Sequence, residues 1–160
     1  MGFVATPAAA DTIGGLTITG GVQGADYAVQ SGNVILVSTP TALSISGTEP
    51  TYTIQTAAGV TANLTLSGAF ITGGNGQAPL DVLGDAVVTL AAGTSNSLTT
   101  VRSAQPAIAI TAGANLTITG AGSLTAASVV TDTCSVPNEK WSHTDWGLTI
   151  VAPPDSSYYA

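Results

Sequence analysis

A short sequence word returns along the chain: an apolar residue alternating with threonine or serine, closed by glycine. It occupies residues 16–20, 43–47, 64–68 and 116–120, with a degraded copy at 88–91 and a partial one at 148–150. Self-similarity at a period of about 20–30 residues is the signature of a repeat architecture. This repeat constrains the fold more than any other feature of the sequence.

Each word has the pattern of a short β-strand with one apolar and one hydroxyl face. Leu and Ile alternate with Thr and Ser at period two, which places the two kinds on opposite faces of a pleated strand. Gly20, Gly47, Gly68 and Gly120 close the words, where we expect tight corners with positive φ. The sequence therefore predicts an all-β protein with Leu and Ile columns inside and hydroxyls outside.

A second column accompanies the first and sets the predicted architecture. Residues 80–82 align with 108–110, and the same offset separates 88 from 116, so two strands are expected to repeat in register. We predict a β-solenoid of about five coils over residues 16–128. An antiparallel β-sandwich is the alternative. Residues 1–15 are predicted as a short N-terminal cap or attachment segment, and 129–160 as an irregular C-terminal cap or interface segment.

The charge of the chain excludes some partners. Only 7% of its 160 residues are charged. The chain has two basic residues, Arg102 and Lys140, and nine acidic ones, which gives a net charge of −7. Nucleic-acid binding requires a basic surface, which two cations cannot build. The longest apolar stretches fall far short of the ~20 residues of a spanning helix, so we predict no membrane span.

The order of motifs resembles a known family, the β-helical carbohydrate-binding domain proteins of bacterial surfaces. The segments that carry the resemblance fall within residues 20–127 and are 26–36, 43–47, 57–66, 78–82 and 112–126. The resemblance implies a right-handed parallel β-helix, similar to a shortened pectate-lyase-type helix without its catalytic residues. It also implies polysaccharide binding, sometimes with calcium. No individual binding residue is carried over.

The sequence offers little for catalysis. Glycoside hydrolysis needs two placed carboxylates, whereas the acids here are isolated along the chain. Asp81 and Asp85 form the closest acidic pair within the repeat and are candidate Ca²⁺ ligands, with solvated turn residues as the alternative. Cys134 and His143 are single representatives of their types and indicate no nucleophilic pair. We predict no catalytic residue, no enzyme and no cofactor other than this calcium.

The most distinctive local segment is aromatic and lies near the C-terminus. It contains Trp141, His143 and Trp146, and Tyr158 and Tyr159 follow. Three roles are open: a stacking platform for sugar rings, a subunit interface, or a hydrophobic plug on the end of the fold. These five residues are the candidate carbohydrate or interface residues.

Two functions from different classes follow. The first is a non-enzymatic structural or surface-display protein, a decoration or fibre subunit of an extracellular or virion assembly. It is expected to be a homo-oligomer, with a trimer as the predicted size, because closed symmetry is the usual outcome. The alternative is a carbohydrate-binding module of a bacterial surface protein. Ice binding by the Thr and Ser rows and polysaccharide lyase activity are two further hypotheses. We predict that the protein works outside the cytoplasm, in the extracellular space, on a cell surface or on a virion.

Overall fold

A computed structural model describes residues 8–74, 77–100 and 106–127, and the backbone of 128, 140–151 and 158–159. The described part is built of strands and contains no helix with the length and apolarity to cross a membrane. The strands are β1 (Asp11–Ile13), β2 (Leu16–Thr19), β3 (Tyr27–Gln30), β4 (Val34–Val37), β5 (Ala42–Glu49), β6 (Thr53–Thr56), β7 (Thr61–Gly73), β8 (Leu80–Val82), β9 (Asp85–Leu90), β10 (Ser95–Thr100), β11 (Ile108–Ile110), β12 (Asn115–Ser128), β13 (Lys140–Val151) and β14 (Tyr158–Tyr159).

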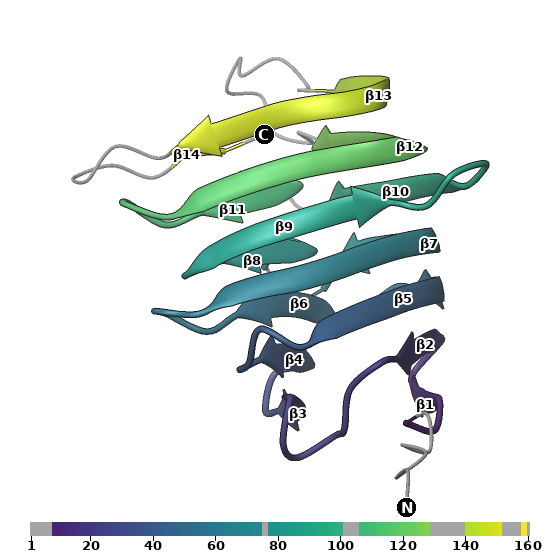
Figure 1. The fold of residues 1–160 in the computed structure, drawn as a ribbon, viewed down its shortest axis with the longest axis vertical. Helices are drawn as coiled ribbons and strands as arrows, with labels where there is room; N and C mark the ends of the chain where they lie inside the picture. Colours follow the sequence, from purple (N-terminus) through teal and green to yellow (C-terminus); the bar gives the residue numbers. More distant parts are fainter. Residues whose placement is uncertain (1–7, 75–76, 101–105, 129–139, 152–157, 160) are drawn as a thin grey trace, which may run out of the picture.

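The strands form two sheets whose members stack along the long axis (Figure 1). The larger sheet has eight strands in the order β1-β2-β5-β7-β10-β12-β13, with β9 paired to both β7 and β12. The smaller has six strands in the order β14-β11-β8-β6-β4-β3. The all-β prediction is therefore confirmed.

Four strands of the larger sheet pair in a closed ring. Strand β7 pairs in parallel with β9 and β10, and β12 pairs in parallel with the same two strands. The first half of β7 meets β9, with Leu66 opposite Leu90, and its end meets β10, with Phe70 opposite Ser97. This closed ring of four parallel strands, beside a separate sheet, contradicts the prediction of a right-handed parallel β-helix of about five coils.

Strand direction departs from that prediction as well. The first two repeated words pair antiparallel, with Leu16 opposite Gly47 and Thr19 opposite Ser44, and β3 with β4 is also antiparallel. The predicted irregular C-terminal segment contains β13, which pairs antiparallel with β12. The physical reason is that a period-two alternation reads the same in both directions. Such words can pair either way without moving a side chain to the wrong face.

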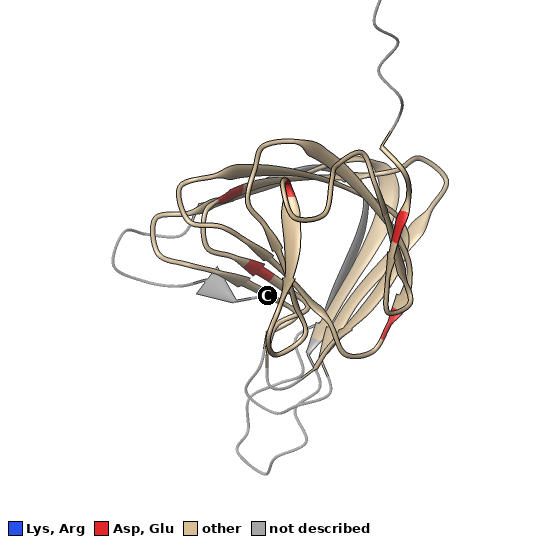
Figure 2. Cartoon of the chain, turned by 90° about the horizontal axis from the view of Figure 1, so that it is seen from below, with Lys and Arg blue, Asp and Glu red and all other residues tan. Residues whose placement is uncertain are grey.

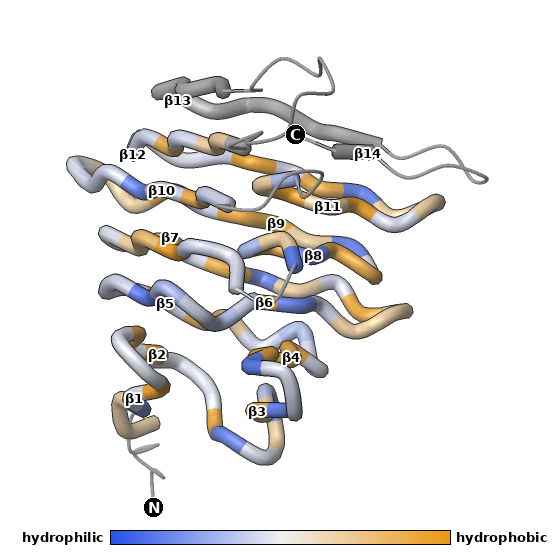
Figure 3. The backbone as a smooth tube through the Cα atoms, turned by 180° about the vertical axis from the view of Figure 1, so that it is seen from behind, coloured by the Kyte–Doolittle hydropathy of each residue, from blue (hydrophilic) through white to orange (hydrophobic). Residues whose placement is uncertain are grey.

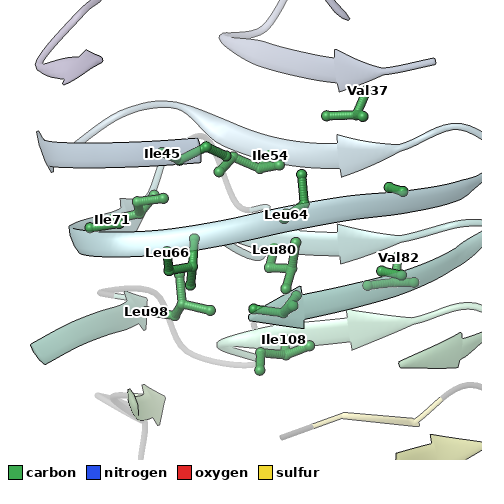
Figure 4. Close-up of a cluster of buried hydrophobic side chains, with 14 of the residues drawn as sticks. Val37, Ile45, Ile54, Leu64, Leu66, Ile71, Leu80, Val82, Leu98 and Ile108 are labelled. Atoms are coloured by element: carbon green, nitrogen blue, oxygen red, sulfur yellow. The ribbon is translucent and has the colours of Figure 1, made fainter. Parts of the chain in front are cut away.

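The interior is formed by the apolar positions of the repeated words. The Leu and Ile side chains of the words at 16–20, 43–47 and 116–120 are at most 1% exposed. Side chains from the larger sheet, such as Leu66 and Leu98, meet those of the smaller, such as Leu80 and Ile108 (Figure 4). Apolar and polar residues alternate along the strands (Figure 3). The prediction of an apolar inside and a hydroxyl outside is confirmed.

The glycines at the ends of the repeated words lie where the backbone turns with positive φ. Gly20, Gly47, Gly68 and Gly120 have φ between 77° and 105°, as expected from the sequence. At Gly120 the neighbouring strand is also close, because a Cβ added there would lie 2.3 Å from the carbonyl oxygen of Leu90. Only glycine combines this φ with this approach.

Candidate functional site

The five aromatic and histidine candidates are distributed over both sheets. Trp141, His143 and Trp146 fall on β13, whose backbone lies beside β12 in the larger sheet. Tyr158 and Tyr159 form β14, which pairs with β11 in the smaller sheet. The side chains of all five lie outside the described part of the structure. Their three possible roles remain predictions.

The two candidate calcium ligands are separated in the fold. Asp81 lies on β8 of the smaller sheet, and its Oδ2 accepts a hydrogen bond of 2.8 Å from Nε2 of Gln55. Asp85 begins β9 of the larger sheet, and its Oδ1 accepts from N and Nδ2 of Asn115 at 2.9 and 3.0 Å. Each carboxylate thus ties its strand to a neighbour. Across the described residues, no three His, Cys, Asp or Glu side chains form a group that could hold a metal ion.

A site that the sequence prediction missed lies on the outer face of the larger sheet, around Phe70. The Phe70 side chain is 44% exposed, and the other large apolar side chains exposed in the described residues, Val22 and Val29, are aliphatic. In register with Phe70 are Thr48 on β5 and Ser97 on β10. An exposed aromatic ring therefore lies between two hydroxyl side chains on the adjacent strands.

A second pair of hydroxyls lies beside the first row. Thr72 and Thr99 are opposite each other on β7 and β10, and their Oγ1 atoms are 3.1 Å apart in a hydrogen bond. All five side chains are on the outward positions of their strands and are at least partly exposed. We call this set, Thr48, Phe70, Thr72, Ser97 and Thr99, the Phe70 patch.

Local sequence explains why Phe70 faces outward. The neighbouring Ala69 and Ile71 are 0% and 1% exposed, so the alternation of the strand turns Phe70 away from the core. The register between β5 and β7 shifts between Ile45 and Gly47, which marks an irregularity beside the start of this half of β7. Such irregularities re-aim the side chains that follow them.

A buried amide fixes the backbone under the Phe70 patch. Asn96, only 2% exposed, accepts hydrogen bonds at its Oδ1 from the N–H groups of Gly68 and Ala69, both at 3.0 Å. Its Nδ2 donates to the carbonyl oxygen of Ser123 at 3.1 Å. One side chain on β10 thereby holds β7 and β12. The residues that follow in sequence on β7 and β10 are Phe70 and Ser97.

The patch itself carries no ionisable side chain. The nearest in sequence is Glu49, which follows Thr48 but is 3% exposed and turned inward. Burial raises the pKa of Glu49, but hydrogen bonds from the N–H of Gly15 and from Thr51 outweigh it and leave the pKa below its ordinary value. The described side chains include five carboxylates and neither Lys nor Arg (Figure 2).

A longer run of hydroxyls crosses the other half of the same sheet. One Thr or Ser per strand lies in register on β2, β5, β7, β9 and β12. We call it the hydroxyl row: Thr19, Ser44, Thr65, Thr89 and Thr119. Its members are all partly exposed, as the repeated word predicts, but no aromatic residue belongs to it.

The chemistry of the Phe70 patch suits a neutral, polyhydroxylated ligand. The face of an aromatic ring offers an apolar surface, while Thr and Ser hydroxyls both donate and accept hydrogen bonds. Sugar rings present CH groups on their faces and hydroxyls at their edges, which is the complementary pattern. The patch has no carboxylate, imidazole or thiol that could act as a base or nucleophile.

Comparison with known proteins points to the same class of ligand. A family model described as "Carbohydrate-binding domain-containing protein" matches residues 31–138, well over half of the chain. The chain belongs to this carbohydrate-binding domain family. The matched region includes the whole Phe70 patch. No curated protein and no solved structure matches the chain.

Membership of the carbohydrate-binding domain family changes the order of the two functional hypotheses. It favours the alternative, a carbohydrate-binding module, over a virion or fibre subunit. The family description names a binding domain and no reaction, in agreement with a non-catalytic module. The predicted family resemblance is confirmed at this level, while its right-handed β-helix is not.

Proposed function

We propose that the protein is a non-catalytic carbohydrate-binding module and that the Phe70 patch is its binding surface. The observation that carries the proposal is the outward aromatic ring of Phe70, 44% exposed and in register between Thr48 and Ser97. This ring lies within the region matched by the carbohydrate-binding family.

Two physical arguments support this surface over the hydroxyl row. Stacking against an aromatic ring supplies apolar contact area that Thr and Ser cannot. Hydroxyls alone exchange hydrogen bonds with water for hydrogen bonds with the ligand, which gives only a small net gain. A surface with both kinds of group obtains its affinity from the ring and its orientation from the hydroxyls.

The proposal extends to where and how the protein acts. A module of this kind works on polysaccharide outside the cytoplasm, on a cell surface or in the extracellular space. It holds its ligand without cleaving it. The predicted trimer is a separate proposal, tested by light scattering. A stable monomer would contradict it without bearing on the binding surface.

The test compares two truncations of exposed apolar side chains. The native protein is screened on a glycan array and by affinity electrophoresis in gels that contain polysaccharide. We expect Phe70→Ala to weaken binding about tenfold or more, and Phe70→Trp to retain it. Val29→Ala is the matched control, since Val29 is 39% exposed but lies on β3 of the other sheet. Circular dichroism and a denaturation curve establish that each variant is folded.

Two results would overturn the proposal. One is a native protein that binds no glycan. The other is folded Phe70→Ala that binds as tightly as the native protein, which would move the binding surface elsewhere.

A further inference from the structure

We infer that the ligand is an extended, uncharged polysaccharide whose chain crosses the strands through Phe70. The inference rests on the proposed function and specifies its ligand. It is drawn from the register of the strands and from the distribution of charge, two observations that do not depend on the family match.

The register gives the surface a direction. Thr48, Phe70 and Ser97 occupy one row on β5, β7 and β10, and Thr125 holds the next position of the same row on β12. Because the strands stack along the long axis, this row runs along that axis (Figure 1). Adjacent strands are about 4.8 Å apart, so the row spans about 14 Å.

The row extends on both sides of Phe70. A sugar ring stacked on Phe70 has Thr48 on one side and Ser97 on the other, and both side chains are at least partly exposed. The neighbouring sugars of a chain can therefore contact hydroxyls in both directions. A single sugar uses only the centre. The arrangement fits an internal segment of a chain better than a chain end.

The charges favour an uncharged chain. A uronic acid polymer carries a carboxylate on each sugar and would approach a protein of net charge −7. The row itself offers no charged side chain to an acidic sugar, since it consists of Thr48, Phe70, Ser97 and Thr125. The predicted calcium ligands, Asp81 on β8 and Asp85 on β9, do not belong to the row of Phe70, so calcium held by them would not bridge a sugar chain to this row.

The first experiment measures affinity against ligand length. Neutral oligosaccharides cut from the polysaccharide that the array identifies are titrated by calorimetry, from monosaccharide to hexasaccharide. We expect affinity to rise at least about tenfold with length and to level off once the ligand spans the row. A monosaccharide that binds as tightly as the polymer would overturn the inference.

The second experiment tests the path of the chain with matched charges. Ser97→Glu and Thr65→Glu each add one carboxylate to an outward position of the same sheet, but only Ser97 lies in the row of Phe70. We expect Ser97→Glu to weaken polymer binding about tenfold and Thr65→Glu to change it less than about twofold. Equal effects of the two variants would contradict a chain path through this row.

The third experiment tests the charge of the ligand. Binding of xyloglucan and glucomannan is compared with binding of polygalacturonate, in EDTA and then with added calcium. We expect the neutral polymer that binds to lose less than about twofold in affinity between about 20 and about 500 mM NaCl. Preference for polygalacturonate under either condition would overturn the inference but leave the proposed function standing. Absence of binding to any glycan would overturn both.

Discussion

The hydroxyl of Tyr27 donates a hydrogen bond to the carboxylate of Asp11, and this bond joins the two sheets. Asp11 begins β1 at the edge of the larger sheet, and Tyr27 begins β3 at the edge of the smaller. The Tyr27 side chain is fully buried. This hydrogen bond links the edge strands of the two sheets at the N-terminal end of the described structure.

Removing that hydroxyl tests what the bond contributes. Tyr27→Phe keeps the buried ring and leaves the partly exposed Asp11 to water. We expect the free energy of unfolding to fall by about 1.5–3 kcal/mol, as for hydrogen bonds to charged groups. Urea denaturation measures the change. Loss of less than about 0.5 kcal/mol would show that water replaces the bond at no net cost.

The environment of Tyr27 also leads us to expect that the stability of the fold depends on pH in the alkaline range. Burial, followed by the hydrogen bond and charge of Asp11, raises the pKa of Tyr27 well above its ordinary value. The folded protein then retains a proton that the unfolded chain releases, so we expect stability to fall as the pH rises above about 10. Tyr27→Phe removes this contribution, and its stability is expected to fall less steeply in denaturation curves at successive pH values. Parallel slopes for the two proteins would contradict the assignment.

The environment of Glu49 leads us to expect a loss of stability in acid. Its carboxylate accepts from N of Gly15 at 2.7 Å and from N and Oγ1 of Thr51 at 2.8 and 2.7 Å. These bonds lower its pKa, so its stabilising contribution is present above the ordinary value of about 4.5 and is lost as the pH falls through the folded value. We expect Glu49→Gln to unfold about 1–3 kcal/mol more easily at neutral pH and to lose less on acidification. Thermal unfolding from neutral to acidic pH measures both effects.

Asn96 predicts a linked loss of stability and binding. Asn96→Ala leaves the buried N–H group of Ala69 and the partly buried one of Gly68 without their acceptor, and we expect the free energy of unfolding to fall by about 2–3 kcal/mol. Because this amide holds the backbone that carries Phe70, glycan affinity should fall as well. Asn63→Ala is the matched control, since its Nδ2 donates to the carbonyl oxygen of Pro40 in a more exposed setting. An equal effect of both variants on stability would contradict a special role for Asn96.

Two glycines with positive φ are predicted to respond differently to alanine. Gly120→Ala brings Cβ within 2.3 Å of the Leu90 carbonyl oxygen, whereas Gly113→Ala meets nothing within 4 Å. Both pay the backbone strain of about 1–2 kcal/mol, and only Gly120→Ala adds a clash with backbone. We expect Gly113→Ala to fold with a modest loss and Gly120→Ala to be at least about 2 kcal/mol less stable than that variant. Denaturation curves of the two proteins give the comparison.

The sequence was sufficient for the faces of the strands and for one pairing, since Leu80 lies opposite Ile108 as expected, but it was insufficient for the others. Alternation assigned Leu16 and Ile18 to the interior correctly, because the inward and outward positions follow from the pattern within one strand. Pairing depends on how two strands align, and the expected match of 88 with 116 is wrong, since Val88 lies opposite Ile118. A shift of two residues keeps every side chain on its own face, so the pattern alone does not distinguish the two registers.

The Phe70 patch escaped prediction for a related reason. In Ala69-Phe70-Ile71 three apolar residues are consecutive, so the alternation of apolar and polar residues does not show which of them faces outward. Phe70 at the middle position of this run is the signal that could have identified an outward aromatic ring. The densest group of aromatic residues in the sequence is instead the C-terminal segment around Trp141 and Trp146. Their side chains lie outside the described structure, and their role is still a prediction.

The row through Phe70 takes one side chain from each strand, and this has an evolutionary consequence. Thr48, Phe70 and Ser97 are more than twenty residues apart in the chain, and each can be exchanged without altering the strand that carries the next. Specificity for a new polysaccharide can then be acquired by single outward substitutions, tried one strand at a time on an unchanged core.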